Sequence, residues 1–127
     1  MRIFLAEVAF WLHLVIGLLW YGLFLVKTSW WPGKIEFHFY LTLFIVGHQF
    51  IWGAIIFPWT RRYRMVCALT TVMQLLRGKK ISDPKNYNYA FTKELFGRAG
   101  ITISHRVMTV LTFSILALVS FQYFFFR

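Results

Sequence analysis

Residues 4–26 read FLAEVAFWLHLVIGLLWYGLFLV, a run of apolar and aromatic residues broken by Glu7 and His13. Residues 37–58 read FHFYLTLFIVGHQFIWGAIIFP, and residues 99–126 form a third long, mainly apolar stretch. About 20 helical residues cross the hydrocarbon core of a bilayer, so each stretch is long enough to span it. The sequence therefore predicts an all-α integral membrane protein with three transmembrane helices.

The composition supports a membrane protein and excludes several other classes. Of the 127 residues, 59% are hydrophobic and only 14% are charged, against about 25% charged residues in soluble domains. The single cysteine, Cys67, excludes an intramolecular disulfide and any site built from several cysteines. No activated nucleophile, carboxylate pair or phosphate-binding glycine loop indicates hydrolysis or group transfer. We expect one transmembrane domain over residues 1–127.

The net charge of +10 is concentrated in one segment. Nine of the fourteen basic residues fall between Arg61 and Arg98, opposed only by Asp83 and Glu94. Loops that stay in the cytoplasm carry such an excess, so we expect a basic cytoplasmic loop over residues 59–98 that contacts anionic lipids. The N-terminus then also lies in the cytoplasm, in a multi-pass protein of the inner (cytoplasmic) membrane. This distribution argues against nucleic-acid binding.

A short helix is predicted between the second and third spans. Its apolar residues recur at helical spacing, and they are Met65, Leu69, Val72 and Leu76. About a dozen residues cannot cross a bilayer, so this is a short cytoplasmic or interfacial helix, either an extension of the second span or a closely docked helix. Residues 78–89 are rich in Gly, Pro, Asn and Asp and predict a loop.

Two histidines lie near the middle of the first two stretches, where ionisable groups are costly and mark candidate functional sites. A rise of about 1.5 Å per residue places His13 and His48 at similar depths on antiparallel neighbouring helices. Two imidazoles between apolar walls suit haem iron, and without carboxylate or thiolate ligands they match zinc or magnesium less well. We therefore predict haem b with His13 and His48 as axial ligands. Each could instead simply hydrogen-bond across a helix interface.

Each of these two helices has a face that would surround such a cofactor. On the first, small residues allow close approach of a helix or a flat macrocycle, and the stripe comprises Ala6, Ala9, His13, Gly17 and Trp20. On the second, the predicted aromatic and aliphatic wall comprises Leu41, Phe44, His48, Trp52 and Ile55.

The third span adds polar groups on one stripe, namely Thr102, His105, Thr109 and Thr112. His105 and Arg106, with Glu7 at a similar depth, are candidates to hold haem propionates or a quinone headgroup, because a guanidinium fork matches a carboxylate. Alternatively, His105 and Arg106 simply begin a helix at headgroup level, Glu7 is neutral or paired with Arg2, and the threonines only pack helices together.

The first span also carries Leu12-His13, with Trp20 seven residues after the histidine and Gly22 two residues later. Over residues 12–25 this pattern resembles the opening helix of copper-resistance D-type membrane proteins and of bacterial membrane protoporphyrinogen oxidases that bind b-type haem. In the oxidases the first-helix histidine is a haem ligand, so the resemblance implies that role for His13. The chain has one span fewer, and spans two and three contain no embedded lysine to match the oxidases' second basic position.

We therefore predict a b-type haem-binding subunit that passes electrons within a larger membrane redox complex, with other transmembrane subunits as partners. Two histidine ligands leave the iron no open position, which favours electron transfer in a non-catalytic subunit over oxygen chemistry. Three alternatives stay open: a cofactor-free structural or accessory subunit, a membrane protoporphyrinogen oxidase-like enzyme, and chlorophyll ligation by the same histidines.

Overall fold

The computed structural model describes residues 1–83 and 91–127, apart from the side chain of His105. All regular structure in these ranges is helical, which confirms the predicted all-α class. The three longest helices are each long and apolar enough to cross a membrane, as predicted. The helices are α1 (Arg2–Gly22), α2 (Lys34–Thr60), α3 (Ala68–Leu76), α4 (Phe91–Arg98) and α5 (His105–Phe126).

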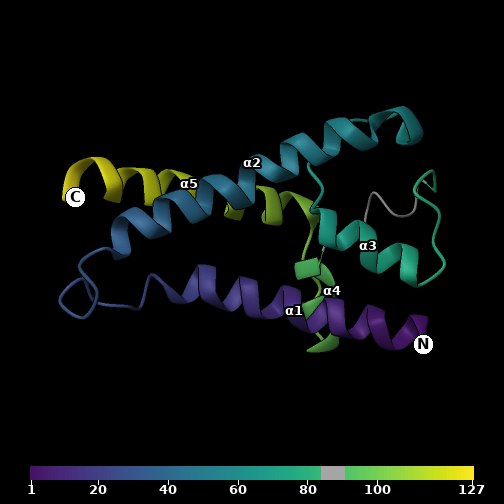
Figure 1. Cartoon of the computed structure of the whole chain (residues 1–127), viewed down its shortest axis with the longest axis horizontal. Helices are drawn as coiled ribbons and strands as arrows, with labels where there is room; N and C mark the ends of the chain where they lie inside the picture. Colours follow the sequence, from purple (N-terminus) through teal and green to yellow (C-terminus); the bar gives the residue numbers. More distant parts are fainter. Residues whose placement is uncertain (84–90) are drawn as a thin grey trace.

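The three spans run in alternating directions (Figure 1). The N-terminus, α3 and the end of α2 lie at one end of the molecule, and the turn after α1 lies with the C-terminus at the other. Helix α2 packs mainly against α5, whereas α1 packs mainly against α3. Fewer than a third of the residues in each span are buried, so most of their surface is left for lipid or partner helices.

The third span begins later than residue 99. Gly100 adopts a left-handed turn (φ 78°), and the Ser104 hydroxyl accepts a hydrogen bond from the Val107 amide (3.3 Å) at the start of α5. A serine cap satisfies one of the free amides of the first helical turn. Its position makes His105 the first residue of the helix, which matches the alternative that His105 and Arg106 simply begin a helix.

After α2, the chain turns back along the helix that it has just left. Arg61 takes a left-handed conformation (φ 55°) that ends α2. The Val66 amide then donates to the Gln49 carbonyl (3.4 Å), some 11 helical positions before the end of α2, or about 16 Å back at 1.5 Å per residue. Residues 62–67, which are not helical, therefore form a re-entrant segment.

Helix α2 accommodates the re-entrant segment through a glycine and two hydrogen bonds. A side chain at Gly53 would collide with the Arg64 carbonyl, so only glycine permits this approach. Farther along, the Trp52 indole donates to the Thr71 hydroxyl (2.9 Å), and the Tyr63 hydroxyl donates to the carbonyl of Phe50, also on α2 (3.2 Å).

Helix α3 is consequently neither an extension of α2 nor a helix lying in the cytoplasm. The extension was wrong because residues 62–67 separate the two helices. The docked helix was right: Met73 is fully buried against Ala6 and Phe10 of α1. A helix of 21 residues is about 31 Å long, barely longer than the hydrocarbon core of about 30 Å, so the part of α1 that α3 contacts lies within the membrane.

The segment expected to be a basic loop thus contains two helices. Helix α4 was not predicted, and its Phe91 is buried in the same cluster as Phe10 and Met73. Residues 78–83 are non-helical, as predicted for the loop over 78–89. The rest of that predicted loop, residues 84–89, lies outside the described residues.

Candidate ligand-binding cavity

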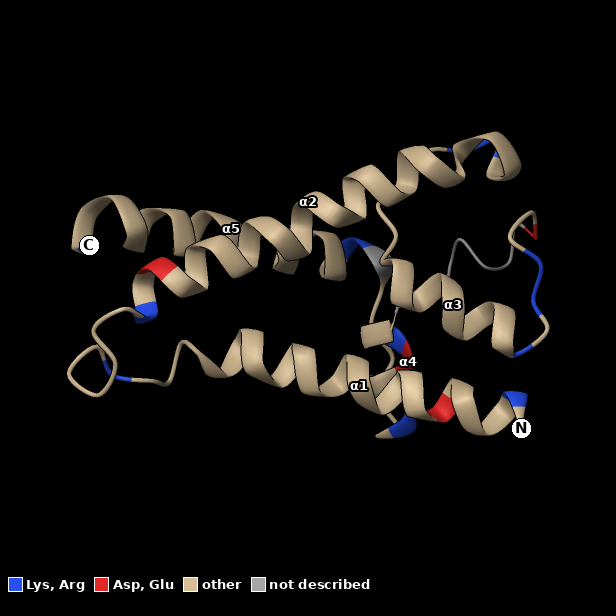
Figure 2. Cartoon of the chain, in the orientation of Figure 1, with Lys and Arg blue, Asp and Glu red and all other residues tan. Residues whose placement is uncertain are grey.

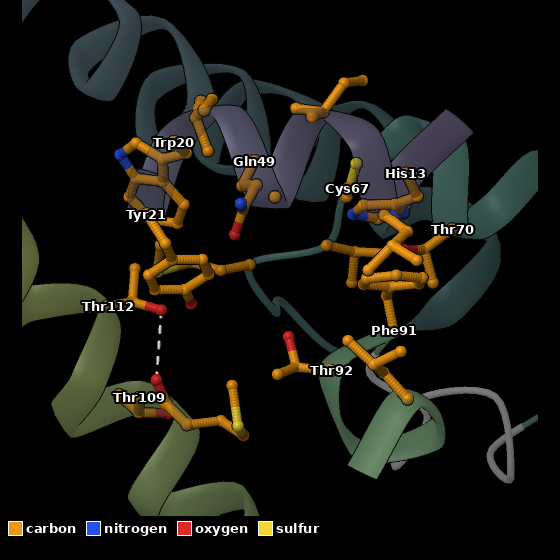
Figure 3. Close-up of a pocket in the computed structure, with 18 of the residues that line it drawn as sticks. His13, Trp20, Tyr21, Gln49, Cys67, Thr70, Phe91, Thr92, Thr109 and Thr112 are labelled. Atoms are coloured by element: carbon orange, nitrogen blue, oxygen red, sulfur yellow. Dashed lines mark hydrogen bonds between the residues drawn. The ribbon is translucent and has the colours of Figure 1, made fainter. Parts of the chain in front are cut away.

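A cavity of about 380 Å³ opens where the re-entrant segment meets the three spans (Figure 3). Its walls come from α1, α2, residues 64–67, the start of α3, α4 and the first half of α5. Non-helical backbone is tolerated at membrane depth only where protein buries it or where it borders a cavity. The re-entrant segment fits this rule, because Arg64, Met65, Val66 and Cys67 all line the cavity.

The cavity wall combines apolar surface with neutral polar groups. The polar side chains are His13, Tyr21, Gln49, Thr70, Thr92, Thr109 and Thr112. In Figure 3, Gln49 projects between the Trp20–Tyr21 side and the His13–Phe91 side. Among the described lining residues, Arg64 alone is charged. An apolar pocket with a few convergent polar groups is the usual form of a small-molecule site.

His13 is the titratable ring that borders this cavity. Its Nδ1 atom is buried and has no hydrogen-bond partner among the described residues. Its ring lies parallel to the Phe91 ring, 4.0 Å between centroids and 7° between planes. The predicted inward stripe of α1 is confirmed, because Ala6, Ala9 and Trp20 are also buried.

His48 is not among the lining residues of the cavity, although it is within electrostatic range of His13. Its Nδ1 lies 3.3 Å from the Phe44 carbonyl, and its ring stacks on the Phe44 side chain, which is 70% exposed. Successive helical residues point about 100° apart, and α2 presents Gln49 rather than His48 to the cavity. The predicted wall on α2 is therefore largely an outer face, with Ile55 exposed as well.

The third span contributes threonines to the cavity. Thr109 and Thr112 line it, and the Thr112 hydroxyl donates to the Met108 carbonyl one turn earlier (3.0 Å; dashed in Figure 3). Arg106 is exposed in the first turn of α5. The side chain of His105 lies outside the described part of the structure. The structure thus brings His13 together with two members of the predicted threonine stripe.

Glu7 belongs to a network of four charges rather than pairing with Arg2. Its carboxylate accepts two hydrogen bonds from Arg98 (3.0 and 3.1 Å) and one from Arg77 (3.4 Å). Glu94 accepts two bonds from Arg77 (2.7 and 2.9 Å) and two from Arg98 (2.7 and 3.1 Å). Hydrogen bonds from Glu7 and Glu94 raise the pKa of the Arg98 guanidinium. We call these four residues the charge network, which joins α1, α3 and α4.

At the opposite end, α2 buries a second histidine that the sequence ranked as a weak candidate. His38 is only 1% exposed and packs edge-on to Phe24 (4.6 Å). Its ring faces the Trp20 carbonyl without hydrogen-bonding geometry, so both ring nitrogens lack a partner among the described residues. Lys34 is also buried, and its ammonium donates to the Val26 carbonyl (2.6 Å).

Lys34, His38 and Thr42 share one face of α2 at four-residue spacing, and all three are buried. The hydroxyl of Thr42 accepts a hydrogen bond from the Trp20 indole (2.9 Å). This spacing marks the inward face of α2 near its start, and it was the signal in the sequence that could have identified that face.

No group of three or more His, Cys, Asp or Glu residues suited to a metal ion occurs in residues 1–83 and 91–127. Comparison of the chain with protein-family models, curated proteins and solved structures finds no match. The function is therefore argued from the cavity alone.

Proposed function

We propose that this protein is a transmembrane subunit of an electron-transfer complex, and that its cavity binds the redox-active ring compound that carries the electron. The observation that supports the proposal is His13, an ionisable side chain at membrane depth that borders the cavity with a buried, unpartnered nitrogen. Such a group in a span is costly unless it binds something. When bound, the ring compound supplies reversible uptake and release of electrons.

Haem b is the first candidate, and the residues fit it in part. His13 is suited to be one axial ligand because it borders a cavity with apolar and aromatic walls. His48 has its Nδ1 next to a backbone carbonyl, the arrangement that orients metal-bound imidazoles. The cavity, however, is lined by Gln49 and not by His48. Ligation by both histidines remains a prediction, and the cavity by itself offers one imidazole.

A quinone is the second candidate, favoured by the size and polarity of the cavity. A volume of about 380 Å³ is near the small end of ligand pockets, which run from about 300 to 1,000 Å³, and it suits a single ring with its substituents. Hydroxyl donors on two sides of the cavity, Tyr21 on α1 and Thr109 on α5, could hydrogen-bond to the carbonyl oxygens of such a ring. Trp20 and Phe113 would provide apolar walls.

The remaining surface supports an assembly in the inner membrane. Exposed apolar side chains on α1, α2 and α5 offer contact area to other transmembrane subunits. Exposed basic side chains gather around the N-terminal end of the molecule (Figure 2), namely Arg2, Arg61, Arg62, Lys79 and Lys93. By the positive-inside rule this end faces the cytoplasm, where anionic lipid headgroups would contact these side chains.

The test is an analysis of cofactors in the purified protein. An absorption spectrum with a Soret band and the reduced alpha band of b-type haem would identify haem, and solvent extraction followed by chromatography would identify a quinone or chlorophyll. His13→Leu should abolish retention of the cofactor, whereas His38→Leu, which alters a buried histidine outside the cavity, should retain it.

The outcomes separate the remaining hypotheses. Loss of haem in His48→Leu as well would establish ligation by both histidines. Cofactor content that is equal in the wild type and His13→Leu would refute the proposed site. A protein without haem, quinone or chlorophyll would instead be a structural subunit, and turnover of a porphyrinogen by isolated membranes would identify an oxidase.

A further inference from the structure

We infer that α4 is a gate over the cavity, held shut by the charge network, and that it controls access to His13. The inference concerns the same cavity as the proposed function and rests on it only in taking the cavity as a ligand site. Helix α4 forms part of the cavity wall, to which it contributes Phe91, Thr92 and Leu95. In Figure 3, Phe91 lies directly beneath the His13 ring, so moving α4 would uncover one face of that imidazole.

Helix α4 is held in place mainly by charge. It has eight residues, and Phe91 is its one buried residue. Its other firm contacts are made by Glu94 and Arg98, which bind Glu7 on α1 and Arg77 at the end of α3. An element with few buried apolar contacts is among the first to open. The Arg77–Glu94 pair is two-pronged, the stronger geometry for such pairs.

A chain of ring contacts connects the charge network to His13. The Arg98 guanidinium lies 3.8 Å from the centre of the Phe10 ring. Phe10 in turn packs against Phe91 at 5.0 Å, and Phe91 stacks on His13 at 4.0 Å. Since each ring touches the next, displacement of Arg98 removes support from Phe91. The network and the cavity are therefore coupled by direct contact.

Release of α4 does not require large apolar surfaces to separate. Glu7 and Arg98 are each 40% exposed in side-chain terms, so water can replace their hydrogen bonds when the helix moves, and exposed ion pairs are weak. The link to α5 contains Gly100 in a left-handed conformation, and glycine adopts other backbone conformations at little steric cost. A cation–π contact and four ion pairs therefore form a latch that can open.

Cys67 provides a reporter for this movement, because it lines the cavity and is the only cysteine in the chain. The experiment measures the rate at which a water-soluble, membrane-impermeant methanethiosulfonate reagent labels Cys67 in nanodiscs, which expose both membrane faces. Phe91→Ala and Glu94→Gln should each label about tenfold faster than the wild type, the change expected from about 1.4 kcal/mol of lost closed-state stability. The wild-type rate should also rise with salt, which screens the exposed charges.

Matched controls lie at the far end of the molecule. Glu36→Gln removes the Glu36–Arg127 pair (2.9 Å), and Phe125→Ala removes an exposed ring of α5, so both should label at the wild-type rate. Cys67→Ser should not label. The double exchange Arg77→Glu with Glu94→Arg should return the rate toward that of the wild type.

Labelling at the wild-type rate in both Phe91→Ala and Glu94→Gln would overturn the gate, as would a wild-type rate that is independent of salt. The salt series needs no variant, so it decides the question even where a substitution prevents folding. Labelling does not depend on haem or quinone, so a gate that opens in a protein free of cofactor would refute the proposed function and leave this inference intact.

Discussion

The end of the molecule that holds the N-terminus is closed by four charged side chains, whereas the opposite end is closed by buried hydrogen bonds and stacked rings. At the first end, the charge network binds α1 to α3 and α4. At the second, the Trp20–Thr42 hydrogen bond joins α1 to α2, and Phe39 of α2 stacks on Tyr123 of α5 at 4.0 Å.

Each end also buries a histidine, and the difference between the two shows what makes a site. His38 sits in continuous helical packing, with no cavity beside it among the lining residues described. His13 lies where residues 62–67 interrupt that packing and leave a cavity. Burial of an imidazole is common to both, so burial alone does not identify the functional one. The irregular backbone next to His13 does.

The largest effect is expected from a substitution that displaces the re-entrant segment. In Gly53→Val the new side chain would collide with the Arg64 carbonyl, and overpacking of this kind costs about 3 kcal/mol. Unfolding in mixed detergent, followed by tryptophan circular dichroism, measures the loss. Gly47→Ala is the matched control on the same helix, because no atom lies within reach of its new carbon. Equal stability of the two variants would contradict the close approach.

A smaller effect is expected when the charge network loses one member. Arg77→Leu removes two hydrogen bonds to Glu94, a carboxylate whose side chain is only 19% exposed. A charged group that loses such partners costs about 2 kcal/mol. The same unfolding assay should show this loss at low salt and a reduced loss at high salt. A loss unchanged by salt would indicate that Arg77 acts by packing alone.

The closing hydrogen bond at the opposite end should contribute less. Trp20→Phe keeps a ring in place but leaves the fully buried Thr42 hydroxyl without its donor, which costs about 1 kcal/mol. This loss should not depend on salt, in contrast to that of Arg77→Leu. The double variant Trp20→Phe with Thr42→Val, which removes both partners, should recover part of the stability, and a further loss would show that the indole acts through its packing.

The smallest effect is expected from the exposed ion pair at that end. Glu36 and Arg127 are 49% and 59% exposed, and such pairs contribute less than about 0.5 kcal/mol. Glu36→Gln should therefore leave the free energy of unfolding within the error of the assay. A loss as large as that of Arg77→Leu would remove the contrast between the two ends.

Much of the fold followed from the sequence. The three spans were predicted because a bilayer requires long apolar helices, a local property of composition. The inward face of α1 was predicted correctly from Ala6, Ala9 and Trp20, because small residues at helical spacing mark close packing. Of the predicted site residues, His13 lines the cavity together with Thr109 and Thr112 of the threonine stripe.

The orientation of α2 did not follow from the sequence. Nearly all of its residues are apolar, so its helical periodicity is weak and its inward face could not be distinguished from the face toward lipid. The prediction chose the face with Phe44 and His48, and the structure turns Gln49 and Thr42 inward. The partners of Glu7 were equally hidden, since Arg77 and Arg98 are 70 and 91 residues away along the chain.

Sequence by itself determined that this chain crosses the membrane three times, because each crossing depends only on the length and apolarity of one segment. The tertiary structure alone decided that residues 62–67 re-enter between the spans, that α3 and α4 pack beside α1, and that His13 borders a cavity while His38 does not. These features depend on contacts between residues far apart in the chain, such as Gly53 with Arg64 and Glu7 with Arg98. Local patterns contain no record of such contacts.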